Sequence, residues 1–77
     1  MNWVSLASSV FDAAIYLHSD RLLYLKFRSG DIYRYFDFPS RKYEEFLAAD
    51  SKGRYFASEI RDKYGYEQVH RLAATTA

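Results

Sequence analysis

The chain has 77 residues, the size of one small domain, and its eleven lysines and arginines nearly balance its ten aspartates and glutamates. The absence of cysteine excludes a disulfide and a thiolate metal site, and the near-neutral charge argues against nucleic-acid binding through a large basic excess. No apolar run approaches the roughly 18 residues of a membrane span. We therefore expect a cytoplasmic protein with no membrane partner. Aromatic side chains, 19% of the residues, would stabilise it.

The first half of the sequence is typical of β-strands. Residues 13–17 (AAIYL) are apolar and are followed by a polar turn at residues 18–21. Residues 22–28 (LLYLKFR) carry an apolar side chain at every second position, and residues 31–38 are rich in aromatic side chains. Three short runs separated by tight turns predict an antiparallel meander.

The second half is typical of helices. Pro39 ends the last strand because proline cannot donate to a strand ladder, and Ser40 is expected to cap a helix over residues 41–49. A second helix is expected to begin at Ser51 as its cap and to end before Gly65.

The last residues carry weaker signals. Residues 66–72 are expected to form a short final turn or an extended tail that packs Val69 and Leu72, and residues 73–77 are expected to be disordered. We therefore predict one domain over residues 1–72. Its fold class is α+β, a three-stranded antiparallel meander followed by two helices packed on one sheet face.

The turn at residues 29–30 decides which face of the sheet each side chain occupies, because a slip of one residue reverses both faces. If these two residues form the whole turn, Phe27 lies opposite Ile32. Tyr33 and Tyr35 would then lie on the exposed face of the sheet.

The alternative is a three-residue loop over residues 28–30, closed by Gly30 in the left-handed region as a β-bulge. Phe27 then lies opposite Asp31, and both tyrosines join the core. This register is favoured, because a two-residue hairpin turn prefers Asn-Gly or Asp-Gly to Ser-Gly. The exposed face would carry Tyr24, Lys26, Arg28, Ile32, Arg34 and Phe36.

Two places combine features that suit nucleic acid. An exposed sheet face with aromatic and basic side chains is typical of surfaces that stack bases and contact phosphates. The start of the second helix, residues 51–54, offers free N–H groups, Gly53 and two basic side chains. The plainer interpretation is that Ser51 only caps the helix, Gly53 only allows close packing, and the two basic side chains are only solvated. The predicted nucleic-acid-binding residues are Tyr24, Lys26, Arg28, Arg34, Phe36, Lys52, Gly53, Arg54 and Arg61.

Catalytic and metal chemistry has no comparable pattern. His18 and His70 are the only histidines, and neither has further ligands at the spacing of a metal site. No serine is paired in the sequence with an evident base and orienting group. We predict no catalytic residues, no metal and no cofactor.

The order of residues resembles the KTSC domain family, which is found at the C-terminus of some lysyl-tRNA synthetases and as small bacterial proteins. The family's central Tyr-x-Tyr is matched by Tyr33-Arg34-Tyr35, and the similarity covers roughly residues 8 to 66. Other matching positions are Ser8-Ser9, Tyr16, Phe27, Gly30, Pro39, Tyr43, Leu47, Ala49, Ser51-Lys52-Gly53, Tyr55-Phe56, Ile60-Arg61 and Tyr64. The resemblance implies a small domain without an established activity, for which RNA binding has been suggested.

The function expected is a non-catalytic binding module for RNA or single-stranded nucleic acid, acting through aromatic and basic surface residues. Tyr33 and Tyr35 would build the sheet rather than touch a ligand. The alternative is a protein–protein interaction module or small homo-oligomer, because the aromatic residues exceed what one small core buries. The candidate partners are therefore RNA, another protein or a second copy of the chain.

Overall fold

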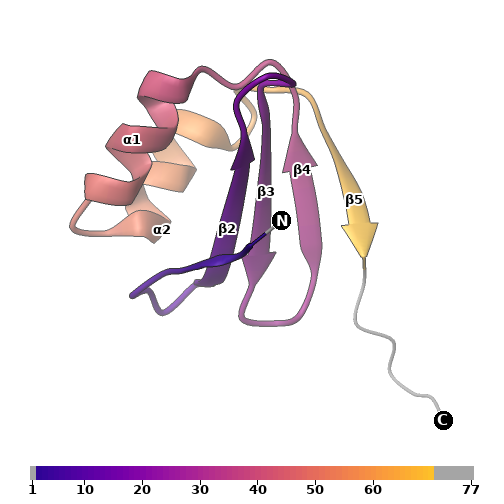
Figure 1. Cartoon of the computed structure of the whole chain (residues 1–77). Helices are drawn as coiled ribbons and strands as arrows, with labels where there is room; N and C mark the ends of the chain where they lie inside the picture. Colours follow the sequence, from indigo (N-terminus) through magenta and orange to yellow (C-terminus); the bar gives the residue numbers. More distant parts are fainter. Residues whose placement is uncertain (1, 71–77) are drawn as a thin grey trace, which may run out of the picture.

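The structure, a computed structural model, describes residues 2–70 and contains one antiparallel sheet with helices packed over one face (Figure 1). The five strands lie side by side in chain order: β1 (Val4–Ser5), β2 (Phe11–Leu17), β3 (Leu22–Phe27), β4 (Ile32–Tyr35) and β5 (Tyr66–His70). The helices between β4 and β5 are α1 (Ser40–Ala48), α2 (Lys52–Tyr55) and a π-helix, η1 (Phe56–Ile60). The domain is thus α+β, with a central β2–β3–β4 meander.

The prediction of three strands was wrong in number, because the sheet has two further outer strands. β1 has only two residues and pairs with β2 at Ala13 and Ala14. β5 pairs with β4, and all five of its residues are exposed. For residues 66–70 the structure shows the extended tail and not the short final turn that was the other alternative. Val69, which was expected to pack, remains 46% exposed. The expectations for Leu72 and for residues 73–77 lie outside the described residues.

The loop between β3 and β4 has the favoured three-residue form. Gly30 has a φ of 101°, and its N–H donates to the Phe27 carbonyl at 2.9 Å. The Phe27 N–H donates to the Asp31 carbonyl, also at 2.9 Å. Tyr33 consequently lies opposite Leu25, and Tyr35 lies opposite Leu23, on the sheet face that the helices cover.

Gly30 is expected to be hard to replace, because L-residues rarely adopt a φ of 101°. We expect Gly30→Ala to lower the free energy of unfolding by about 1–3 kcal/mol, the cost of a residue held in a sparsely populated backbone region. Urea unfolding followed by circular dichroism measures this change. Ser29→Ala, in the same loop at an exposed position, is the control. Equal losses of unfolding free energy in the two variants would contradict the left-handed conformation of Gly30.

The first helix begins differently from the prediction. Pro39 occupies the cap position and no side chain caps the helix, so Ser40 is the first helical residue. Proline suits this end because its missing N–H would have no helical partner there. By contrast, the Ser51 cap of α2 is confirmed, since its hydroxyl oxygen accepts from the Arg54 N–H at 3.2 Å.

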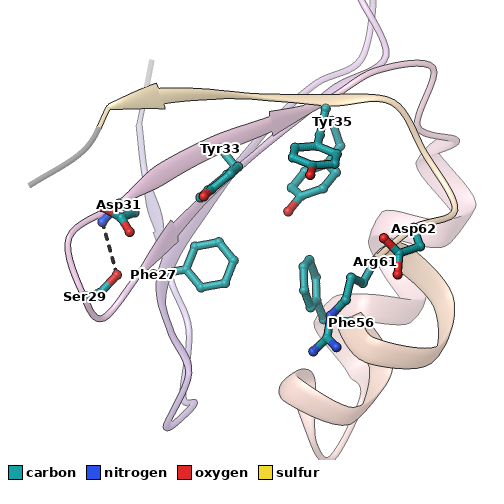
Figure 2. Close-up of a pocket in the computed structure, with 9 residues that line it drawn as sticks. Phe27, Ser29, Asp31, Tyr33, Tyr35, Phe56, Arg61 and Asp62 are labelled. Carbon is teal, nitrogen blue, oxygen red and sulfur yellow. Dashed lines mark hydrogen bonds between the residues drawn. The ribbon is translucent and has the colours of Figure 1, made fainter.

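The second helix is shorter than predicted and changes type along its length. At its end, the Arg61 N–H donates to the Phe56 carbonyl at 2.8 Å, the wide hydrogen bond of a π-helix. The helix thus ends at Ile60, four residues before Tyr64, the last residue of the predicted helix, and Asp62 with its φ of 63° then turns the chain away. This early end brings Arg61 and Asp62 to the edge of the sheet (Figure 2).

The core lies between the inner face of the sheet and the helices, and aromatic rings dominate it. Phe11 has no exposed surface, and its ring contacts one ring each from β3, α1 and η1. Its ring centroid lies 4.8 Å from that of Phe27, 5.5 Å from Phe46 and 5.3 Å from Phe56. The largest fully buried side chains are Phe11, Phe38, Phe46, Leu23, Leu25 and Ile60.

An ion pair connects the helices, and it predicts a dependence on pH. Lys42 Nζ lies 2.7 Å from a carboxylate oxygen of Glu59, and this hydrogen bond lowers the pKa of Glu59. A lowered folded pKa means that the pair stabilises the fold above the unfolded value of about 4.3, and that this stabilisation disappears as pH falls through the folded pKa. We expect Lys42→Met to raise the Glu59 pKa towards its ordinary value, measured by carboxyl-carbon NMR titration. An unchanged Glu59 pKa in the variant would contradict the pairing.

Candidate functional site

An aromatic pocket with a volume of about 320 Å³ lies between β3, β4 and β5 on one side and the end of η1 on the other (Figure 2). It is on the covered face of the sheet, at the margin of the core. Its lining residues are Phe27, Ser29, Asp31, Tyr33, Tyr35, Phe56, Arg61, Asp62 and Tyr66. Five of these nine carry aromatic rings, so the walls are mainly flat and apolar.

The strand register explains how the rings come together. The three-residue loop turns Tyr33 and Tyr35 to the same face as Phe27, and β5 places Tyr66 opposite Tyr35. Neighbouring rings are in contact: the Tyr33 centroid lies 5.6 Å from Phe27 and 5.9 Å from Tyr66. Phe56 closes the side formed by η1, with its centroid 5.8 Å from Phe27 and 5.9 Å from Tyr35. Such ring pairs stabilise one another, which holds the walls in place.

Polar groups lie at two opposite ends of the aromatic pocket (Figure 2). Ser29 and Asp31 come from the β3–β4 loop, and the Asp31 N–H donates to the Ser29 hydroxyl at 3.4 Å. Arg61 and Asp62 come from the turn after η1. The guanidinium carbon of Arg61 is 5.7 Å from the Phe56 ring centroid, and Arg61 makes no ion pair within residues 2–70. This arginine can therefore meet an incoming anion.

Tyr35 is the most buried polar residue of the lining, with 4% of its surface exposed. Its pKa is raised, first because burial disfavours the phenolate and then because the phenols of Tyr33 and Tyr66 lie nearby. The positive charge of Arg61 opposes this rise. Tyr35 consequently stays a neutral hydroxyl group at physiological pH, able both to donate and to accept a hydrogen bond.

The predicted outer-face residues form a second cluster, on the opposite side of the sheet. The Arg34 guanidinium donates to the Tyr24 hydroxyl at 3.2 Å and to the Glu67 carboxylate at 2.9 Å. It also lies 5.7 Å from the Phe36 ring centroid. The structure thus brings Tyr24, Arg34 and Phe36 together, but Glu67 of β5 already pairs with the central charge.

The other predicted bases of the sheet also have partners inside the molecule. Lys26 Nζ lies 4.0 Å from the Asp12 carboxylate and 6.0 Å from the Trp3 ring centroid. The Arg28 side chain donates to the Ser8 carbonyl at 2.6 Å. A phosphate that approached this face would compete with these contacts.

The start of α2, predicted as a phosphate site, is built mainly from structural contacts. Lys52 Nζ donates to the Ala49 carbonyl at 2.8 Å, which satisfies the end of α1. A side chain at Gly53 would meet Val10 Cγ2 at 3.0 Å, so the glycine allows close packing here. Arg54 remains exposed. A hollow of about 190 Å³ lies beside these residues, with Asp50 in its lining.

Most of the aromatic pocket was not among the predicted binding residues. Arg61 was predicted to bind a ligand, whereas Tyr33 and Tyr35 were assigned to the sheet alone. Tyr66 was missed because β5 was not predicted as a paired strand. The alternation of apolar residues in 22–28 gave a usable signal for Phe27, since it places that ring on the same face as the two tyrosines.

Other classes of site have little support in the described part of the chain. Within residues 2–70, no three His, Asp or Glu side chains gather into a group that could hold a metal ion. None of the described helices is long and apolar enough to cross a membrane. Large apolar side chains are exposed at both edges of the sheet, Trp3 and Val4 at β1 and Tyr66 and Val69 on β5, and Val10 is exposed just before β2. Association through these residues stays a prediction.

Comparison with known proteins identifies relatives of this fold. The model of the KTSC domain matches residues 7–64. The chain is 41% identical over 54 residues to a lysine–tRNA ligase of Trichormus variabilis and 41% identical over 61 residues to one of Nostoc sp., covering 70% and 79% of this chain. It spans only about a tenth of the length of these ligases, 10% and 11%.

Smaller relatives match along most of their length. A protein of Tsukamurella paurometabola is 32% identical over 57 residues, which cover 74% of this chain and 85% of that protein. The crystal structure of a KTSC domain protein from Yersinia pestis superposes with a TM-score of 0.86 at 29% identity, covering 90% of this chain and 97% of the other. The chain therefore belongs to the KTSC domain family.

Proposed function

We propose that the chain is a binding module for single-stranded RNA and that the aromatic pocket receives one unstacked base. The observation that carries this proposal is the group of five aromatic side chains around a space of about 320 Å³, with Arg61 beside it. This volume is within the range of small-ligand sites. Stacking of a base on aromatic side chains contributes about 1–3 kcal/mol, and an arginine at the margin suits the adjoining phosphate.

RNA is favoured among nucleic acids because two relatives are named as lysine–tRNA ligases, in which a segment similar to this chain forms about a tenth of the length. The pocket is favoured over the outer cluster of Tyr24, Arg34 and Phe36. Binding there would require Arg34 to leave Glu67, whereas Arg61 has no such partner within residues 2–70. Few lysine and arginine side chains are free to contact phosphate groups, so the affinity for RNA should depend only weakly on salt concentration.

The test is binding of a fluorescent single-stranded RNA of mixed sequence, followed by anisotropy at several salt concentrations. We expect Arg61→Ala to weaken binding and to reduce the salt slope by about one, the loss of one phosphate contact. Arg41→Ala is the matched control, because Arg41 is an exposed arginine on α1 outside the pocket lining. Equal losses in the two variants, or no binding by the wild type at about 50 mM salt, would overturn the proposal.

A further inference from the structure

Tyr35 is a buried residue, yet its hydroxyl has no hydrogen-bond partner in the described part of the chain and is not among the fully enclosed polar atoms. Tyr35 is 4% exposed, and no hydrogen bond joins its hydroxyl to any residue within 2–70. Buried tyrosine hydroxyls are normally hydrogen-bonded. Here, Tyr16 donates to the Phe38 carbonyl, and Tyr55 donates to Glu45 at 2.7 Å. The hydroxyls of Tyr16 and Tyr55 thus have hydrogen-bond partners within the molecule, whereas the hydroxyl of Tyr35 has none among the described residues.

The surroundings of this hydroxyl place it on the side of the aromatic pocket. The three groups that act on it electrostatically are the phenols of Tyr33 and Tyr66 and the guanidinium of Arg61. All three line the pocket, and so does Tyr35 itself. A partner that entered the pocket would thus meet the hydroxyl, with rings on either side of it (Figure 2).

We infer that the Tyr35 hydroxyl recognises the base by a hydrogen bond to a nitrogen or oxygen atom on the edge of its ring. This inference rests on the proposed function, and it adds the group that would distinguish a base from an apolar ring of similar shape. A site with a buried polar group disfavours ligands that leave the group unpaired. The aromatic walls would therefore supply stacking to any flat ring, and Tyr35 would select rings with polar edges.

The same geometry predicts different effects of Tyr35→Phe on stability and on binding. The hydroxyl has no partner in the free protein, so its removal should leave the unfolding temperature unchanged or raise it. Binding of a nucleotide should weaken about fivefold, the worth of one net hydrogen bond. Tyr43→Phe is the matched control, because Tyr43 is also buried without a hydrogen bond in the described chain but lies outside the pocket lining.

The probes are uridine monophosphate and a riboside monophosphate that carries a phenyl ring in place of the base, titrated by NMR. We expect Tyr35→Phe to weaken the uridine nucleotide about fivefold and to leave the phenyl analogue unaffected. Equal effects on the two ligands, or no effect on either, would overturn the role of Tyr35 while leaving the RNA proposal standing. Loss of folding in Tyr35→Phe would overturn it as well, because the hydroxyl would then have a structural partner. If the wild type bound neither nucleotide nor RNA, the proposed function would fail together with this inference.

Discussion

Phe11→Ala is expected to leave much of the protein unfolded at 37 °C. Phe11 has no exposed surface, and its ring contacts Phe27, Phe46 and Phe56. Truncation of a buried phenylalanine costs about 3–5 kcal/mol through lost burial and the cavity left behind. Small domains have only about 0.05–0.15 kcal/mol of stability per residue, so this loss is a large fraction of the total.

Thermal unfolding measures this effect directly. We expect the midpoint of Phe11→Ala to fall by more than about 12 °C, since about 1 kcal/mol corresponds to about 4–8 °C in a domain of this size. The neighbouring Val10→Ala is the control, because Val10 is 39% exposed and its change should cost less than about 1 kcal/mol. A similar midpoint in the two variants would show that Phe11 does not join the sheet to the helices.

Tyr66→Ala is expected to weaken RNA binding strongly at a small cost in stability. Tyr66 lines the aromatic pocket and is 56% exposed, on the outer strand β5. Loss of one stacking ring should lower the affinity for single-stranded RNA about five- to 150-fold, at about 1–3 kcal/mol per stacked base. Its cost in stability should be about 1 kcal/mol, the order of the lost ring contacts with Tyr33 and Tyr35.

A matched substitution on the same strand separates binding from any effect on β5 itself. Val69 is 46% exposed and lies outside the pocket lining, so Val69→Ala should leave the affinity unchanged. The measurement is fluorescence anisotropy with the same RNA, together with urea unfolding of each variant. If Val69→Ala lost as much affinity as Tyr66→Ala, the loss would come from the strand and not from the ring.

The centre of the fold could be predicted because its sequence signals are local. Alternating apolar residues predicted β3, and the chemistry of the Ser29-Gly30 turn favoured the observed register. Turn type depends on a few neighbouring residues, and Gly30 at the end of the loop suits the left-handed conformation that the structure has there. The expectation that both tyrosines face the helices followed from this turn alone.

The outer strands could not be predicted, because nothing in their own residues requires a strand. β1 has two residues, and the five exposed residues of β5 show no alternation of burial. β5 exists because β4 offers an edge to pair with, which is a tertiary contact. The π-helix was missed for a related reason: the wide hydrogen bond from Arg61 to Phe56 has no composition signal.

The candidate site was missed because it depends on these same elements. The pocket needs Tyr66 from β5 and the early end of η1, which places Arg61 and Asp62 next to the sheet. The sequence did indicate an aromatic and basic binding surface, but it assigned that surface to the outer face. There the structure pairs Arg34 with Glu67. The Tyr-x-Tyr motif, interpreted as structural, contributes two walls of the pocket.

The most direct test of the account is an NMR titration of the isotopically labelled protein with a short single-stranded RNA, because it locates the binding face without any substitution. We expect the largest changes in chemical shift on residues of the aromatic pocket, above all Tyr33, Phe56, Arg61 and Tyr66. Changes concentrated on Tyr24, Lys26 and Arg34 would move the site to the outer face and contradict the central claim. Saturating RNA that left every signal unchanged would contradict RNA binding itself.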